Sequence, residues 1–317
     1  MSAAPVAVSE GAAPIRFSFE VFPARSGAAA LALGHAVQHL AAAGPEFISV
    51  TYGASGSSQD ASLDLLKYLR QHTDALPLAH LTTVAMPRER LAEVIRETLQ
   101  AGISDFLALR GDPPKGSDER DPAVTASLDA VELIRLIDEV RAERDETGDA
   151  DPRSGAGRTS VAVYPNGHPL SRSRRADIDW LIAKEAAGAS FGITQLFFHA
   201  EDYLGFVSEA REAGLTMPIL PGLMPVATGA QLRKVASLAG QPAPSDLERA
   251  LETSGSAEPG VAHTVGLARE LLAGGAPSVH LYTFNRHQQV LAVLRELGVL
   301  TPDPVSVGPR PPVDASR

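Results

Sequence analysis

One acidic residue lies inside an otherwise apolar segment near the N-terminus. Residues 17–23, FSFEVFP, alternate apolar and polar positions, which predicts a strand with one face in a core. Pro23 cannot donate to a sheet ladder, so the strand should end there, with Glu20 near its carboxyl end. Burial among apolar neighbours raises the pKa of a carboxyl group and would make Glu20 a proton donor near neutral pH. The alternative is a solvated glutamate on an edge strand, and this segment alone does not separate the two.

Polar side chains of several kinds stand near the ends of strands predicted further along the chain. Taken singly, each has a structural explanation: His80 could be a satisfied core histidine, and Arg110 could pair with Asp112 within a turn. Their convergence on one end of the fold favours a site. Together with Glu20, the candidates from this pattern are Thr51, His80, Arg110, Asp112, Tyr164, His168, Gln195, Tyr282 and Arg286.

The residue types limit the chemistry. The chain has no cysteine, which excludes disulfides, thiolate nucleophiles and cysteine-ligated metals, and it has no Gly-x-Ser-x-Gly motif for acyl transfer. His80 and His168 lack an obvious third ligand, so we predict no metal site. The Arg, Lys, Tyr, Thr and His side chains suit a polar, phosphate-bearing ligand. One poised acid beside such a ligand favours a cofactor-dependent redox enzyme over a hydrolase, although spacing alone does not name the cofactor.

Eight predicted strands, each followed by a helical segment, must position these residues. Strands are expected at residues 15–22, 47–52, 78–84, 103–109, 161–164, 193–198, 218–222 and 278–283. Strand–helix alternation requires parallel pairing with right-handed crossovers, and eight such units close into a single (β/α)8 TIM barrel of the α/β class. In that fold the site lies at the carboxyl ends of the strands. An open doubly wound sheet is the alternative, which is weakened because no Gly-x-Gly-x-x-Gly follows the first strand.

The chain reads as one barrel with two tails. We predict a disordered N-terminal tail at 1–14, the catalytic barrel at 15–300, a flexible, charged loop at about 142–159 and a Pro-rich tail at 301–317. The net charge of −10, with no long basic run, argues against nucleic acid and anionic membranes as partners. The sequence shows neither a signal-peptide pattern nor an apolar run long enough to span a membrane, so we expect a cytoplasmic protein.

Several of these segments together resemble methylenetetrahydrofolate reductase, a flavoprotein family of one-carbon metabolism. The family's fold is a (β/α)8 barrel, in agreement with the strands counted above. The length leads us to expect the bacterial type, with a catalytic domain only. The matching pieces, in the family's order, are residues 17–23 (FSFEVFP), 50–54 (VTYGA), 80–82 (HLT), 109–112 (LRGD), 164–169 (YPNGHP), 193–198 (ITQLFF), 221–225 (PGLMP) and 282–286 (YTFNR).

The resemblance implies reduction of 5,10-methylenetetrahydrofolate to 5-methyltetrahydrofolate. NADH or NADPH would reduce bound FAD, and the reduced flavin would then pass hydride to the folate in a ping-pong cycle. By the family pattern, Glu20 is the general acid toward folate N10, and Asp112 lies near flavin and folate, where it would favour a cationic iminium. Gln195 would hydrogen-bond the pterin, with Tyr282 and Arg286 on the substrate side. The residues implied to hold FAD are Thr51, His80, Arg110, Gly111, Asp112, Tyr164, His168, Asp177 and Lys184.

Two other functions stay open at this point. One is the same folate reduction by direct hydride transfer from NAD(P)H without flavin, and the other is a non-catalytic folate-binding protein. The presence of the FAD-holding residues argues against the first, and the retention of Glu20, Asp112 and Gln195 argues against the second. One position departs from the resemblance: an aromatic residue that stacks on nicotinamide and folate in some relatives falls at Gly229, which has no ring. Family members commonly self-associate, so we expect a homo-oligomer.

Overall fold

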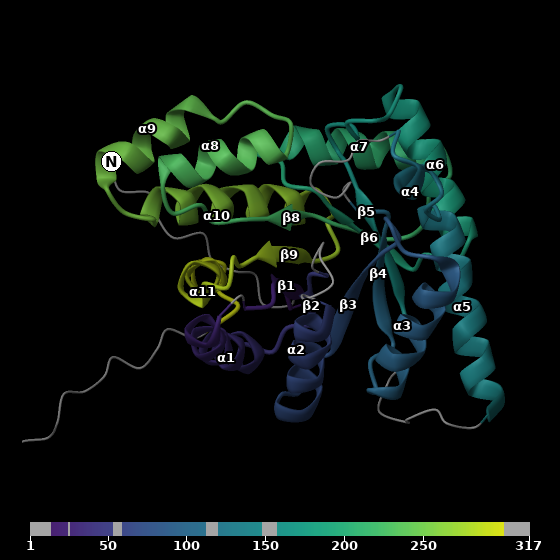
Figure 1. Ribbon diagram of the computed structural model, residues 1–317. Helices are drawn as coiled ribbons and strands as arrows, with labels where there is room; N and C mark the ends of the chain where they lie inside the picture. Colours follow the sequence, from purple (N-terminus) through teal and green to yellow (C-terminus); the bar gives the residue numbers. More distant parts are fainter. Residues whose placement is uncertain (1–13, 25, 53–58, 112–119, 148–156, 301–317) are drawn as a thin grey trace, which may run out of the picture.

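Parallel strands form a ring at the centre of the molecule, and helices cover its outside (Figure 1). The computed structural model describes residues 14–24, 26–52, 59–111, 120–147 and 157–300. Every strand pair is parallel, in the order β7-β6-β5-β4-β3-β2-β1-β9-β8. The strands are β1 Phe17–Val21, β2 Ile48–Val50, β3 Pro77–Thr82, β4 Asp105–Leu109, β5 Thr159–Val163, β6 Phe191–Thr194, β7 Ile219–Leu220, β8 Gly222–Leu223 and β9 Val279–Tyr282.

The ring closes at a strand that is interrupted by one proline. β7 pairs with β6 and β8 pairs with β9, and only Pro221 separates β7 from β8. Proline has no N–H for a sheet ladder, but its carbonyl still accepts a 2.9 Å hydrogen bond from the backbone of His280. β7 and β8 are therefore two halves of one seventh strand that bridges its neighbours on both sides. The eight-stranded (β/α)8 barrel predicted from the sequence is confirmed.

The helices follow the predicted alternation, with two differences. Residues 142–147 continue α5 where a flexible loop was predicted, and a short helix, α4, lies at 122–125, where the polar sequence of residues 113–125 predicts a loop. The charged residues near 142 form the solvent side of a helix, because Glu143 pairs with Arg96 of α3 at 2.9 Å. Residues 148–156 and both predicted tails lie outside the described residues, apart from Pro14. The helices are α1 Gly27–Ala42, α2 Gln59–His72, α3 Arg88–Gln100, α4 Pro122–Thr125, α5 Ala130–Thr147, α6 Arg174–Ala186, α7 Ala200–Glu212, α8 Gly229–Leu238, α9 Ser245–Ser254, α10 Glu258–Ala273 and α11 His287–Glu296.

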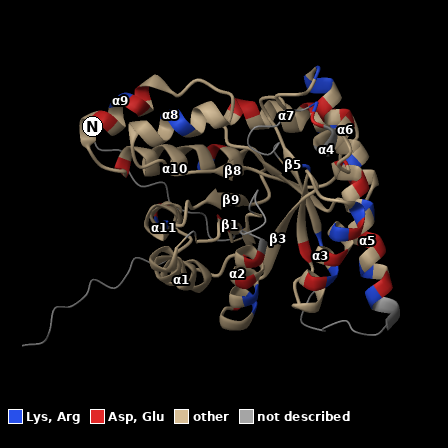
Figure 2. Cartoon of the chain, viewed as in Figure 1, with Lys and Arg blue, Asp and Glu red and all other residues tan. Residues whose placement is uncertain are grey.

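Charge and apolar surface are divided between the outside and the inside of the barrel. Figure 2 shows acidic and basic side chains along the outer helices, for example α3, α5 and α9. Phe17, Phe19 and Val21 of β1 are buried in the main apolar core, together with Leu33 and Val37 of α1. The alternate residues of β1 therefore point into the barrel, as the pleat of a strand requires. Among the described helices, none is both long and apolar enough to cross a bilayer.

An ion pair covers the amino-terminal end of the barrel. The carboxylate of Asp105, at the start of β4, accepts three hydrogen bonds from Arg158. The donors are the backbone N–H (2.8 Å), Nε (2.9 Å) and Nη2 (2.7 Å) of the arginine. The guanidinium of Arg158 lies 5.6 Å from the ring centre of Phe47 and 5.3 Å from that of Phe191. Those rings belong to an apolar layer inside the barrel. The residues of that layer are Phe47, Leu78, Leu107, Phe191, Ile193 and Leu220.

We expect Asp105→Ala to lower the free energy of unfolding by about 2–3 kcal/mol, because three hydrogen bonds to a buried carboxylate are lost and Arg158 is left unpaired. Urea unfolding would measure this loss. Asp179→Ala is the matched control, since its pair with Arg175 is exposed and should contribute less than about 0.5 kcal/mol. Equal effects of the two substitutions would contradict a structural role for the Asp105–Arg158 pair.

Candidate active site

Glu20 and His80 face each other inside the barrel. In the sheet register Glu20 lies between Ser49 of β2 and Tyr282 of β9. Its Oε2 is 3.5 Å from Nε2 of His80 on β3. Burial raises the pKa of Glu20 to about 8, and burial lowers the pKa of His80 to about 3. At neutral pH a protonated carboxyl group therefore faces a neutral imidazole, which favours the buried proton donor over the solvated edge-strand glutamate.

The backbone around Glu20 is held by the loop that follows β9. The Thr283 hydroxyl donates to the Glu20 carbonyl at 2.7 Å. The Asn285 side chain accepts from the Phe22 N–H at 3.0 Å and donates to the Phe22 carbonyl at 2.8 Å. Phe284 and Asn285 have φ angles of 48° and 59°, an uncommon left-handed pair. We call residues 283–285 the β1 clamp, because these contacts fix the end of the strand that carries Glu20.

Tyr282 spans from β9 to β6 beside Glu20. Its hydroxyl donates to the Thr194 carbonyl at 2.7 Å. Burial, and then the charge of Glu20, raise the pKa of Tyr282 well above its usual value, so the phenol stays neutral. Gly222 makes this position possible: a Cβ there would lie 2.4 Å from the Thr194 carbonyl oxygen and 2.6 Å from Cε2 of Tyr282. Pro221 and Gly222, in the middle of the seventh strand, thus lie where the barrel closes, and the glycine leaves room for this tyrosine.

A large cleft opens at the carboxyl ends of β2 to β6. Its volume is about 740 Å³, within the range of about 300–1,000 Å³ typical of small-molecule sites. All eight described residues that the resemblance implied for the cofactor line it, and Gln195 lines it as well. Asp112 lies outside the described residues, directly after Gly111 of the cleft wall. The predicted residues in the wall are Thr51, His80, Arg110, Gly111, Tyr164, His168, Asp177, Lys184 and Gln195.

The charged residues of the cleft favour an anion. The described wall contains Arg110, Arg172 and Lys184 against Asp129 and Asp177, whereas the whole chain carries a net charge of −10. Burial lowers the pKa of Lys184 to about 8, while Asp177 and Asp129 act in the opposite direction. The Lys184 Nζ donates to the Ala162 carbonyl at a long 3.4 Å. A buried ammonium group of this kind is stabilised when an anionic ligand pairs with it.

The backbone at Gly111 is shaped for close approach. Gly111 has a φ of +87°, and a Cβ there would lie 3.0 Å from Cβ of Thr82. Gly111 is the second residue after β4 and lies in the wall of the cleft, where the carbonyl of the preceding Arg110 accepts hydrogen bonds from the backbone of Thr83 and Val84. A side chain at Gly111 would be strained and would push against β3. The backbone conformation and the contact with β3 therefore explain why residue 111 is a glycine.

Sequence reasoning missed several residues of the wall, of which Trp180 is the largest. Trp180 lies on α6 between Asp177 and Lys184, and 43% of it is exposed. Positions i, i+3 and i+7 share one face of a helix, so the spacing of these three residues was a signal that the sequence offered. Trp180 is also the only tryptophan of the chain, which makes it a fluorescent reporter for this cleft.

Three predicted residues do not line the large cleft. Glu20 and Tyr282 lie next to it, with His80 connecting Glu20 to the wall. Arg286 is exposed just before α11, where its backbone N–H donates to the Thr283 carbonyl at 2.9 Å. Gly229 is the first residue of α8 and packs against α9, since a Cβ there would lie 3.2 Å from the Glu252 side chain. A side chain at position 229 would require the Glu252 side chain to shift, and the glycine itself offers no ring for stacking.

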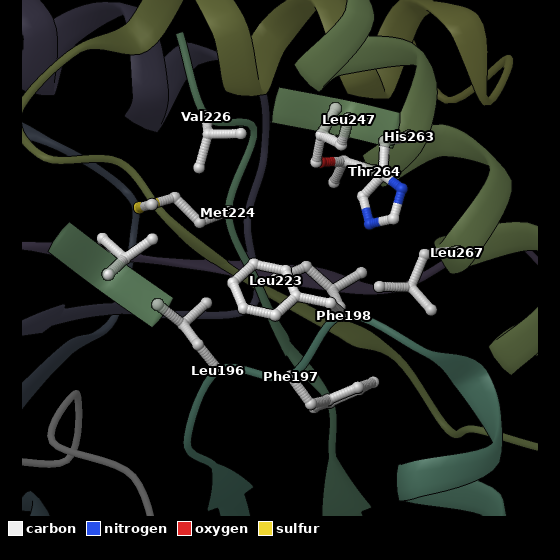
Figure 3. A pocket seen from close by; sticks show the side chains of 11 residues that line it. Leu196, Phe197, Phe198, Leu223, Met224, Val226, Leu247, His263, Thr264 and Leu267 are labelled. Atoms are coloured by element: carbon white, nitrogen blue, oxygen red, sulfur yellow. The ribbon is translucent and has the colours of Figure 1, made fainter. Parts of the chain in front are cut away.

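A second, apolar cavity lies under α9 and α10 and is not a ligand site. Figure 3 shows its walls, in which His263 and Thr264 are the polar residues among apolar side chains such as Phe198 and Met224. Its volume is about 10 Å³, which is at the lower limit for one water molecule. The cavity is therefore a small packing gap, and the 740 Å³ cleft is the candidate site.

Comparisons with known proteins agree on one family. The family model described as methylenetetrahydrofolate reductase matches residues 7–298. The 5,10-methylenetetrahydrofolate reductases of Pectobacterium carotovorum and Escherichia coli are each 32% identical, over 90% of this chain and 91% of theirs. The methylenetetrahydrofolate reductase (NADH) 1 of Arabidopsis thaliana is 30% identical over 92% of this chain, which spans about half (49%) of the length of that relative.

Among solved structures, one similar fold is an uncharacterized protein from Clostridium thermocellum that binds two copies of 5-methyl-5,6,7,8-tetrahydrofolic acid. The TM-score is 0.60, with 14% identity over 89% of this chain and 93% of the other. At this identity the likeness shows the fold alone.

We expect Gly222→Ala to displace Tyr282 and to lower the free energy of unfolding by about 1–3 kcal/mol, because a methyl group at this position overlaps two neighbours. Chemical denaturation measures the loss. Gly266→Ala is the control: it lies in α10 with no atom within 4 Å of the added Cβ, and should stabilise the helix by up to about 1 kcal/mol. A Gly222→Ala protein as stable as the wild type would show that Tyr282 does not need this space.

Proposed function

Because the chain belongs to the methylenetetrahydrofolate reductase family, we propose that it reduces 5,10-methylenetetrahydrofolate to 5-methyltetrahydrofolate with NADH or NADPH, through bound FAD. In this reaction the bond between the methylene carbon and N10 breaks, and N10 takes a proton. The cationic iminium left at N5 accepts a hydride and becomes the methyl group. The reaction thus consumes one hydride from the nicotinamide and one proton, which the enzyme must deliver to a defined nitrogen.

Glu20 is the residue that carries this proposal. Its carboxyl group is buried beside a neutral histidine, its pKa is raised to about 8, and 21% of its side chain remains exposed. A group in this state holds a proton at neutral pH and can still be reached by a ligand. We propose that Glu20 protonates N10 of the folate. The β1 clamp keeps the donor in place, because Thr283 and Asn285 fix the backbone on both sides of Val21.

The described residues of the large cleft fit FAD. The buried Lys184 amine and the cationic balance of the wall suit a diphosphate, and Gly111 leaves room for a ligand against the backbone. We propose that Thr51, His80, Arg110, Gly111, Tyr164, His168, Asp177 and Lys184 hold it. When bound, the flavin supplies two-electron hydride chemistry between nicotinamide and folate.

Four further residues are proposed to contact the substrate or the flavin. The Gln195 amide oxygen accepts from the Leu196 N–H at 2.8 Å, so its NH2 group is the part left to donate to a pterin. Tyr282 and Arg286 are proposed on the substrate side, next to Glu20 and to the β1 clamp. Asp112 is proposed to lie near the flavin and the folate iminium. This role rests on the family resemblance of residues 109–112, of which Gly111 lines the cleft.

The absorbance spectrum of the purified protein tests the cofactor. We expect a flavin band that bleaches with anaerobic NADH or NADPH and returns when 5,10-methylenetetrahydrofolate is added. FAD added to the apoprotein should quench the fluorescence of Trp180, since the tryptophan lines the cleft. Lys184→Gln should weaken this binding at least about tenfold, because a charge-assisted contact to the diphosphate is lost.

Each other outcome points to one alternative. A colourless protein that oxidises NAD(P)H only when the folate is present would indicate direct hydride transfer without flavin. No reaction with added FAD and either nicotinamide would leave a folate-binding protein. Lys234→Gln, in α8 and outside the cleft wall, is the control for the Lys184 variant and should bind FAD as the wild type does.

The raised pKa of Glu20 predicts a pH dependence of the folate half-reaction. The donor is protonated below pH 8, so the rate should be level there and fall about tenfold per pH unit above it. Glu20→Gln should lower the rate about 10²–10⁴-fold below pH 8 and remove the fall in rate above it, while flavin reduction by NAD(P)H continues. Stopped-flow absorbance separates the two half-reactions.

Stability gives an independent check of the same group. The folded pKa of Glu20 exceeds the usual value of 4.5, so the folded state binds the proton more tightly. The resulting contribution of Glu20 to the free energy of unfolding is fully present below pH 4.5 and is lost as pH rises toward 8. Glu20→Gln should remove this decrease of stability with pH. Glu201→Gln, in the first turn of α7, is the exposed control. An unchanged slope in the Glu20 variant would show that Glu20 titrates normally.

A further inference from the structure

Three histidines meet on the outside of the barrel, away from the cleft. His35 and His39 are one turn apart on α1, and His287 is the first residue of α11. One potential ligand atom of each imidazole lies within 4.8 Å of the other two. We propose that these three histidines form a binding site for a divalent transition-metal ion, with Zn²⁺ as the expected occupant. This inference is independent of the proposed folate chemistry.

The three rings lie close together, and those of His39 and His287 are stacked with an interplanar angle of 24°. The ring centres of His35 and His39 are 4.3 Å apart, those of His39 and His287 are 4.5 Å apart, and those of His35 and His287 are 5.6 Å apart. In a tetrahedral zinc site, bonds of about 2.0–2.1 Å place the nitrogens about 3.4 Å from one another. His35 and His39 are exposed and His287 is half-buried, so the side chains have room to rotate until their nitrogens face one ion.

A backbone contact fixes one ligand in the state that metals bind. Nδ1 of His39 lies 3.0 Å from the carbonyl oxygen of His35. A carbonyl can only accept, so Nδ1 carries the proton and Nε2 keeps its lone pair. Histidines that bind metals usually donate their other ring N–H to a carbonyl or carboxylate in this way. The contact therefore prepares His39 as an Nε2 ligand.

The cluster offers nitrogen ligands. Helix α1 carries no acidic or basic side chain other than histidine, as its uniform colour in Figure 2 shows. No carboxylate among the described residues ion-pairs with the three rings, so the donor set is imidazole alone. Such a set selects zinc, nickel or copper over magnesium or calcium, which prefer oxygen ligands.

The position of the site gives it a structural consequence. α1 follows β1 and α11 follows β9, and these two strands pair with each other. Figure 1 shows the two helices side by side. A metal ion there would join the first and last helices of the barrel. Only Arg286 separates His287 from the β1 clamp, so the ion would hold the base of the loop that fixes the end of β1. Three protein ligands leave the fourth position open to water.

Calorimetric titration of Zn²⁺ into untagged protein, stripped with chelator, tests the site. We expect one ion per chain and a rise of about 5 °C in the unfolding midpoint when free zinc exceeds the dissociation constant a hundredfold. His287→Ala is the decisive variant, because it leaves the His35–His39 pair of α1 intact. It should weaken zinc binding at least about tenfold, and His39→Ala should do the same. Mg²⁺ should have no effect.

A matched control and a conservative variant keep the test sharp. His72→Ala removes an exposed histidine of α2 whose ring lies 4.8 Å from that of Tyr68, and the variant should bind zinc as the wild type does. His287→Gln replaces the alanine variant if that protein does not fold, as judged by circular dichroism. Unchanged affinity in the folded His287 variant would overturn the three-histidine site and leave a helical pair or another location. Absence of stoichiometric zinc uptake by the wild type would overturn it as well.

Discussion

The proposed chemistry depends on keeping one carboxyl group protonated inside the barrel. Water around Glu20 would return its pKa toward that of an ordinary glutamate, and the group would then be an anion at neutral pH. The fold prevents this by enclosing Glu20 between two neighbouring strands, facing a histidine that burial keeps neutral. A cationic histidine at position 80 would stabilise the carboxylate and remove the proton donor. A neutral pair of Glu20 and His80 therefore suits the proposed proton transfer, whereas a salt bridge between them would not.

Enclosure alone would leave the donor free to shift, and the closure of the barrel limits this movement. β1 pairs with β9, so the loop after β9 can reach the end of β1 and hold it through Thr283 and Asn285. The left-handed backbone at Phe284 and Asn285 has a free-energy cost, which the two-sided contact with Phe22 offsets. On the other side of β9, Pro221 and Gly222 let the seventh strand change partners and give Tyr282 its space.

The sequence was sufficient for the parts of this arrangement that depend on local patterns. Alternation around Glu20, the turn signals after each strand and the strand count predicted the barrel and the end at which polar residues gather. It could not show that Glu20 faces His80, because the contact joins residues 60 positions apart, and register is a property of the closed sheet. The end of α5 was misjudged because charged residues near 142 suit a loop and the exposed side of a helix equally.

The histidine cluster shows the same limit most clearly. His35 and His39 have a spacing that a helix makes adjacent, but two imidazoles alone do not make a tetrahedral site. His287 joins them only because β1 and β9 pair and thereby bring the first and last helices together. A search for ligands by sequence spacing therefore finds two histidines and predicts no site. In a closed barrel the first and last strands pair, so the two ends of the chain become neighbours. Contacts across this closure are the ones that spacing along the sequence predicts least well.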